Sequence, residues 1–232
     1  MPSPAQNSAS VAGVDGAAGA WIVAVLDGRD VELTLAQDVD AVLDVTQNCA
    51  AVGVDMPLSI PDTGMRTAEA EVRRFLGSAR SSIFATPVRE AVYADSWEEA
   101  CVISRAHTGK AISKQSWYLT RYIQAWQAAE PDLLRVLEVH PESSFRALAP
   151  DTVFTSKKRA RGIAQRLGAL EDVVDTARLI RRVAELDDGP AMDDVLDAVA
   201  AAWSARRWLT GEADVFGDSA LDSRGRPDRI IV

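Results

Sequence analysis

The sequence has few of the residues that build disulfide frameworks, zinc sites or membrane spans. Only two of its 232 residues are cysteines and two are histidines, which excludes a disulfide-stapled scaffold and a cysteine-based zinc site. No apolar run approaches the roughly 18 residues that a membrane-spanning helix needs. The first ten residues also lack the basic and apolar segments of a signal peptide. We therefore expect a protein of the reducing cytoplasm with no membrane partner.

Positive charge is scarce along most of the chain. Lys and Arg total 25 against 34 for Asp and Glu, a net charge of −9, which argues against a general coat for duplex nucleic acid. The exception is the segment 156–182, where eight basic residues accompany three acidic ones. Such a basic face is compatible with a phosphate-bearing ligand, and equally with ordinary solvated helices.

The remaining composition is that of a folded domain. Hydrophobic residues make up 47% of the chain and charged residues 25%, which supplies a packed core and excludes wholesale disorder. The length favours one domain carrying an insertion rather than two domains. We expect a disordered tail at 1–10 and a single domain over 11–232, with a mostly helical insertion at about 61–131.

The apolar runs predict an α/β domain that begins β-β-β-α-β. Three short strands come first, separated by a Gly-rich turn and by an Asp27-Gly28 hairpin turn. A short helix, a buried strand that stops at Pro57, and further alternation follow. The predicted strands are 11–15, about 20–26, 31–35, the run before Pro57 and 133–140, with an edge strand in the C-terminal tail; the predicted helices outside the insertion are 38–46, about 156–168, about 171–187 and about 192–210.

Three of these strands each carry a carboxylate near an end. Asp15, Asp55 and Glu138 occupy these positions, although a buried strand disfavours acids because desolvating a carboxylate is costly without a neutralising partner. Their recurrence indicates a shared cationic partner. Taken alone, Asp15 before Gly16 and Asp55 before Met-Pro can also be read as turn residues.

The helix predicted to start near residue 192 contributes a further pair of acids. At about 100° per residue, Asp194 and Asp197 lie roughly 60° apart on one face. The same stripe continues in small alanines, which let a helix approach a sheet closely. A cluster of hard carboxylate oxygens suits Mg²⁺ or Mn²⁺ better than zinc. Asp194 in the first turn can instead serve as a cap, whereas Asp197 lies inside the helix.

Four motifs, in this order, resemble the family catalogued as domain of unknown function 429, which is regarded as predicted RNase H-like nucleases. They are GVDGAAGAW, VGVDMPLSIP, LEVHPESSFRAL and MDDVLDAVAAAW, and the resemblance covers about residues 11–232. The family often has Cys-x-Gly-Gly after the first Asp-Gly, where this chain has Ala17-Ala18-Gly19-Ala20. The last motif is also similar to the acidic helix of bacterial Holliday-junction resolvases.

The resemblance implies an RNase H-like mixed sheet of three antiparallel strands followed by parallel strands, flanked by helices. It also implies a nuclease in which two Mg²⁺ ions bridge a scissile phosphate of RNA, DNA or a nucleotide. The metal ligands and catalytic residues carried over are Asp15, Asp55, Glu138, Asp194 and Asp197. His140 is a candidate proton shuttle that contacts substrate, or a structural histidine before Pro141.

Basic residues of the insertion are candidates for substrate contacts. Arg66 and Arg73 share a helical face, and Lys114 precedes Trp117 in a stretch that recurs in the family. Arg pairs phosphate oxygens, and Trp can stack on a base. A salt-bridged helix with a core tryptophan is the alternative interpretation.

Two other functions fit parts of the pattern. A non-catalytic nucleic-acid or nucleotide binding module would keep the fold and lose the chemistry. A phosphotransferase of the actin and sugar-kinase type would use the Asp-Gly hairpin, but such enzymes need two of these domains. Trp203 and Trp208 on the last helix would serve either the core or the surface of a homodimer.

Overall fold

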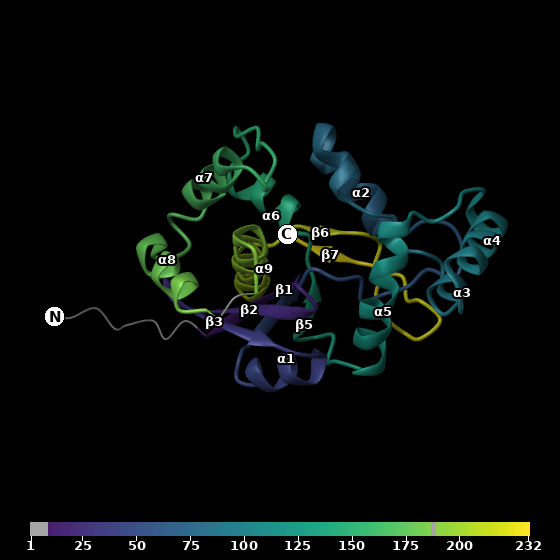
Figure 1. The fold of residues 1–232 in the computed structure, drawn as a ribbon, viewed down its shortest axis with the longest axis horizontal. Coiled ribbons are helices and arrows are strands. Elements are labelled where there is room, and N and C mark those ends of the chain that lie inside the picture. The colour runs from purple at the N-terminus through teal and green to yellow at the C-terminus, as the bar shows by residue number, and fades with distance from the viewer. Residues whose placement is uncertain (1–8, 187–188) are drawn as a thin grey trace.

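The computed structural model describes residues 9–186 and 189–232, so residues 1–8 of the predicted tail lie outside the described residues. A five-stranded mixed sheet lies at its centre with helices on both faces (Figure 1). The strand order is β3-β2-β1-β4-β5. β1, β2 and β3 are antiparallel, and β4 and β5 run parallel to β1. The predicted RNase H-like sheet is confirmed; its strands are β1 (Val11–Ala17), β2 (Ala20–Asp27), β3 (Asp30–Ala36), β4 (Ala51–Val54) and β5 (Val136–Glu138).

Two-residue turns join the first three strands. Ala18 and Gly19 connect β1 to β2 with φ of 46° and 91°. Gly19 supplies the left-handed conformation that this turn requires. The two departures from the family pattern are Ala17 and Ala20. They are register partners in β1 and β2 and lie outside the left-handed turn, so they cause no backbone strain. The second turn is centred on Gly28 and Arg29, one residue later than Asp27-Gly28, because Asp27 pairs with Asp30.

The long helix α9 (Met192–Thr210) lies directly across one face of the sheet (Figure 1). Gly13 of β1 and Gly53 of β4 are register partners beneath it. A Cβ at Gly13 would lie 1.9 Å from the Ala198 carbonyl oxygen, and one at Gly53 would lie 2.4 Å from that of Ala201. The helix backbone therefore rests on the sheet backbone, which only the paired glycines permit.

The opposite face of the sheet carries its own apolar core. Val14, Val23 and Val52 pack there with α1 (Val39–Val45) and with Trp126 of α5 (Lys114–Ala128). Asp38 caps α1 by accepting from the Ala41 amide. Alternate residues of each strand thus serve two different cores, as a sheet covered on both faces requires.

Between β4 and β5 the chain is helical, as the pattern predicts. This segment contains α2 (Thr67–Leu76), the 3₁₀ helix η1 (Gly77–Ser82), α3 (Arg89–Val92), α4 (Trp97–Thr108) and α5. β5 has three residues rather than the eight predicted at 133–140. A turn in which the Asp132 carbonyl accepts the Arg135 and Val136 amides occupies the first part of that run.

The C-terminal third adds helices and a small second sheet. α6 (Pro141–Leu148), α7 (Ala160–Ala169) and α8 (Thr176–Ala184) precede α9, and β6 (Val215–Phe216) pairs with β7 (Ile230–Ile231). α7 and α8 begin four and five residues later than predicted, and the predicted last residue of α8, 187, lies outside the described residues. Asp175 caps α8 by accepting from the Arg178 amide. The edge strand predicted in the tail is β7, which bridges to Val139 beside β5.

The tryptophans of α9 are packed within this chain. Trp203 and Trp208 lie partly buried against the main core, beneath the guanidinium groups of Arg207 and Arg229 respectively. A homodimer through these residues stays a prediction. Within 9–186 and 189–232, none of the helices has both the length and the apolar character needed to cross a bilayer.

Candidate metal centre and substrate pocket

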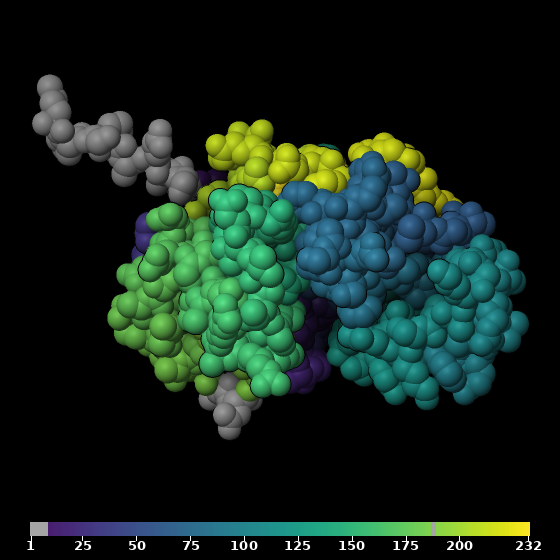
Figure 2. All heavy atoms as spheres, turned by 90° about the horizontal axis from the view of Figure 1, so that it is seen from above, coloured from purple at the N-terminus to yellow at the C-terminus, as the bar shows by residue number. Residues whose placement is uncertain are grey.

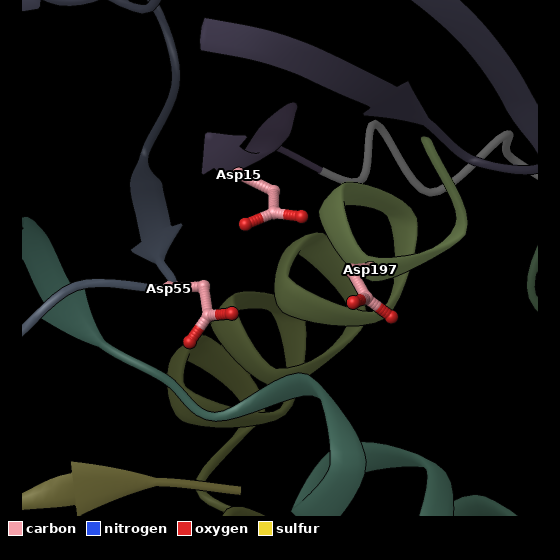
Figure 3. A group of neighbouring side chains, drawn as sticks. All are labelled: Asp15, Asp55 and Asp197. Carbon is pink, nitrogen blue, oxygen red and sulfur yellow. The ribbon is translucent and has the colours of Figure 1, made fainter. Parts of the chain in front are cut away.

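Three aspartates meet where the carboxyl ends of two parallel strands lie beneath α9 (Figure 3). Asp15 lies in β1, Asp55 directly follows β4, and Asp197 projects from the second turn of α9. One carboxylate oxygen from each lies within 4.8 Å of the others. The three residues, named here the Asp triad, come from segments far apart in the sequence.

Strand pleat and the glycine contact bring the Asp triad together. Alternation along β1 puts Asp15 on the same face as Gly13, and β4 does the same for Asp55 and Gly53. Because Gly13 and Gly53 are register partners, the two acids follow side by side on the α9 face. Asp197 precedes the Ala198 that touches Gly13, so the same contact sets the height of its carboxylate above the strand ends.

The Asp triad concentrates negative charge in a buried place. Burial raises the pKa of Asp15 well above its usual range, and the charges of Asp55 and Asp197 raise it further. Burial and the neighbouring Asp197 raise the pKa of Asp55 to about 7. Burial raises the pKa of Asp197 to about 6, although the Lys157 ammonium acts in the opposite direction. Three carboxyls whose ionisation is opposed in this way favour an added cation.

Lys157 supplies one positive charge from the loop between α6 and α7. Its ammonium contacts Asp197 Oδ2, and its side chain is 33% exposed. Burial works against its protonation, but the charges of Asp197, Asp15 and Asp55 outweigh this and raise its pKa. Lys157 is a site residue that motif reasoning misses, and the signal that could have found it is the basic segment that starts at residue 156.

The remaining oxygen of Asp197 is the best indication that the Asp triad holds an ion. Asp197 is fully buried, and its Oδ1 has no hydrogen-bond partner within the described parts of the chain. An unpaired buried carboxylate oxygen is costly unless something binds it. The donor set of three carboxylates is the kind that hard divalent cations take. The three residues therefore could hold a metal ion.

The other acids of α9 have different partners. Asp194 Oδ2 accepts from the Ala191 amide at 3.1 Å, which is the capping role. Asp193 pairs with Lys158 at 2.6 Å. The structure thus leaves Asp194 at the edge of the cluster, about one helical turn from Asp197, and its assignment as a metal ligand stays a prediction.

Glu138 lines the same cavity as the Asp triad, although its register partner is Val54, so strand alternation directs its side chain to the opposite face of the sheet. Its two oxygens accept from Arg66 Nη1 at 2.6 Å and Arg66 Nη2 at 2.9 Å, and the Leu58 amide adds a third hydrogen bond. Arg66 is 3% exposed and also binds Asp228 through Nε. Metal binding by Glu138, or phosphate binding by Arg66, would require breaking this buried ion pair, which is strongly unfavourable.

The other predicted substrate contacts are also spread apart. Arg73 donates to the Ile83 carbonyl at 3.0 Å, and exposed Lys114 lies 4.7 Å from the Trp97 ring centroid. His140 lines the same cavity as the Asp triad, but its Nδ1 accepts the Ser143 amide at the start of α6. Burial lowers the pKa of His140 to about 4, so the imidazole is neutral near pH 7.

A cavity of about 470 Å³ opens beside the Asp triad. Its acidic side is lined by the triad, Lys157 and Glu142, and Glu142 is held by Arg166 at 2.6 Å. Figure 2 shows a groove between the green surface of α6 to α8 and the blue and teal surface of the helical insertion, with purple N-terminal strands at its floor. The cavity is lined from both sides of this groove.

Comparison with known proteins places these acids in a family. The profile described as "Protein of unknown function (DUF429)" matches residues 13–221, which include the whole Asp triad. The chain belongs to that family. No curated protein and no solved structure matches this DUF429 chain. The match confirms the resemblance drawn from the four motifs, and it assigns no reaction.

Proposed function

We propose that this DUF429 protein is a divalent-metal-dependent phosphodiesterase that acts on nucleic acid. The observation that supports the proposal is the Asp triad, whose oxygens converge within 4.8 Å beside a cavity. Among residues 9–186 and 189–232, the buried Asp197 Oδ1 has no hydrogen-bond partner. The RNase H-like sheet supports the proposal only by analogy. Proteins of one fold can catalyse unrelated reactions, so the arrangement of residues in the site is stronger evidence than the fold.

Asp15, Asp55 and Asp197 would hold Mg²⁺ or Mn²⁺. When bound, the metal would supply a water nucleophile at neutral pH and neutralise charge on the phosphate. The chain's own part is to keep three carboxylates converged at low dielectric, so that a cation stabilises them more than water does. Whether one ion or two bind is part of the proposal and is open to titration.

Lys157 would orient the substrate phosphate. Its ammonium already lies among the acids, and its partial exposure lets it turn from Asp197 towards an incoming phosphate oxygen. The neutral imidazole of His140 can accept a proton, but Nδ1 is occupied by the Ser143 amide. We therefore give His140 a positioning role at the start of α6 rather than a proton transfer.

Calorimetric titration with Mg²⁺ and with Mn²⁺ tests the proposal. The wild type should bind, and the double variant Asp15→Asn with Asp197→Asn should lose binding. Asp194→Asn is the matched control, because it removes an acid of the same helix that serves as a cap. Retention of binding by Asp194→Asn would assign the ligands to the Asp triad; equal loss in both would contradict that assignment.

Hydrolysis of labelled single-stranded and double-stranded RNA and DNA then tests the chemistry. The wild type with Mn²⁺ or Mg²⁺ should cleave at least one of them, and the double variant should lose nearly all turnover while its thermal unfolding shows a folded protein. Metal binding without any cleavage would favour the non-catalytic binding module.

A further inference from the structure

The cavity beside the Asp triad has two chemically different sides. The Asp triad and Lys157 come from β1, the end of β4, α9 and the loop before α7, and Glu142 comes from α6. The other side comes from the insertion, where Phe84, Leu119 and Tyr122 line the same cavity beside the polar residues Glu69, Ser82 and Gln115. Phe84 is 40% exposed although it is a large apolar residue. We call these three residues the apolar wall.

The hairpin between β1 and β2 connects the apolar wall to the Asp triad within a few residues. Gly16 follows Asp15 and pairs across the hairpin with Trp21. A Cβ at Gly16 would lie 4.0 Å from the Trp21 ring, which in turn meets Tyr122 edge-on at 5.5 Å between centroids. Aromatic surface therefore begins one residue away from a proposed metal ligand.

We infer that the cavity takes one unpaired nucleotide, with its phosphate at the Asp triad and its base against the apolar wall. This inference rests on the proposed function for the phosphate end alone. A volume of about 470 Å³ lies in the range of sites for small organic ligands. Aromatic and apolar walls hold nucleobases by stacking, and stacking tolerates any base.

The chemistry of the wall favours unpaired over paired bases. In a duplex, both faces of a base are covered by its neighbours, so the apolar wall gains contact only with a base that has left the stack. The net charge of −9 also disfavours long tracking of a phosphate backbone. The substrate class is thus a mononucleotide unit at a strand end, in a loop or free in solution.

The test uses adenosine 5′-monophosphate (AMP), which has no phosphodiester bond and so is read by binding rather than by turnover. Calorimetry with Mg²⁺ compares AMP with ribose 5-phosphate, which lacks the base. The wild type should bind AMP about tenfold or more tightly, the size expected for one stacked base. Equal affinities for the two compounds would overturn the inference.

Two variants locate the base. Phe84→Ala should lower the affinity for AMP about tenfold and leave ribose 5-phosphate unchanged, while Tyr118→Ala, which removes a 64% exposed aromatic outside the cavity lining, should change neither. Gly16→Leu should place a side chain against the Trp21 ring and occupy the space for the base. This variant should lose AMP binding and keep Mg²⁺ binding. Unchanged AMP affinity in both Phe84→Ala and Gly16→Leu would contradict the assignment of the wall.

Competition against AMP separates the sources of the nucleotide. Displacement by single-stranded (dA)₆ would identify a strand end or loop, and failure to displace would identify a free nucleotide. A blunt hairpin duplex that competes as well as (dA)₆ would overturn the preference for unpaired bases. If AMP binds as expected and no nucleic acid is hydrolysed, the proposed phosphodiesterase fails and the nucleotide site stands.

Discussion

Lys157 puts a positive charge among carboxylates that would otherwise repel one another. Its ammonium binds Asp197 Oδ2 and leaves Oδ1 of the same carboxylate without a partner in the described chain. A metal ion at the Asp triad must share the acids with this ammonium or displace it. The residue therefore sets the metal affinity as well as the charge presented to a phosphate.

Lys157→Gln should raise the affinity for Mg²⁺ about tenfold, since a competing cation next to the ligands is removed. The same variant should weaken AMP binding, because one phosphate partner is lost. Calorimetry on both ligands measures the two effects. Lys158→Gln is the control: the neighbouring lysine pairs with Asp193, outside the triad. Weaker Mg²⁺ binding by Lys157→Gln would show that the ammonium does not compete.

At the scale of elements, the site depends on how closely α9 approaches β1 and β4. The contact is backbone on backbone, with a Cβ at Gly13 placed 1.9 Å from the Ala198 oxygen. Close-packed interiors relax little when a methyl group is forced into them. Any added atom at Gly13 therefore moves α9, and Asp197 moves with it.

Gly13→Ala should lower the free energy of unfolding by about 2–4 kcal/mol and weaken Mg²⁺ binding, because the helix lifts from the sheet. Urea unfolding and calorimetry are the measurements. Gly168→Ala is the matched control, since this exposed glycine of α7 has no atom within 4 Å of an added Cβ. It should stabilise the protein by about 0.5–1 kcal/mol. A destabilised Gly13→Ala protein with unchanged Mg²⁺ affinity would show that the geometry of the Asp triad does not depend on the position of α9.

For the whole molecule, the buried acids make the stability of the metal-free protein depend on pH. The folded state holds protons on Asp15 and Asp55 to higher pH than the unfolded chain does. For Asp55 this contribution is complete below the ordinary carboxyl pKa and is lost as pH rises through about 7, and Asp15 acts in the same direction. His140, with its pKa lowered to about 4, acts in the opposite sense, but only below its ordinary pKa of about 6.5.

With EDTA present, the free energy of unfolding should fall by about 1 kcal/mol between pH 6.5 and 8.5. Urea titrations at several pH values measure it. Asp55→Asn should flatten this dependence and stabilise the protein at pH 8.5, whereas Asp40→Asn, an exposed acid of α1, should leave it unchanged. Excess Mg²⁺ should also remove the decline. A free energy of unfolding that rises over this pH range would contradict the raised pKa values of the Asp triad.

The sequence predicts the central sheet and part of the candidate metal site. The β-β-β-α-β succession, α9 with its end at Gly211, and the candidacy of Asp15, Asp55 and Asp197 follow from local patterns and from the family motifs. Glu138 shows where such reasoning stops, because its position near a strand end does not reveal that Arg66, 72 residues away, neutralises it. Hydrophobic periodicity also does not predict the first residues of α7 and α8, because caps and loop contacts determine where these helices begin.

The sequence by itself determined which strands form, that each hairpin turns at a glycine, and that acids stand where buried strands disfavour them. These depend on local pleat, dihedral preference and desolvation, which act between near neighbours. Only the tertiary structure decided which acids converge, because convergence depends on two glycines 40 positions apart lying side by side under α9. The entry of Lys157 into the triad and the apolar wall across the cavity were decided there too, since both bring together charges or surfaces from distant segments.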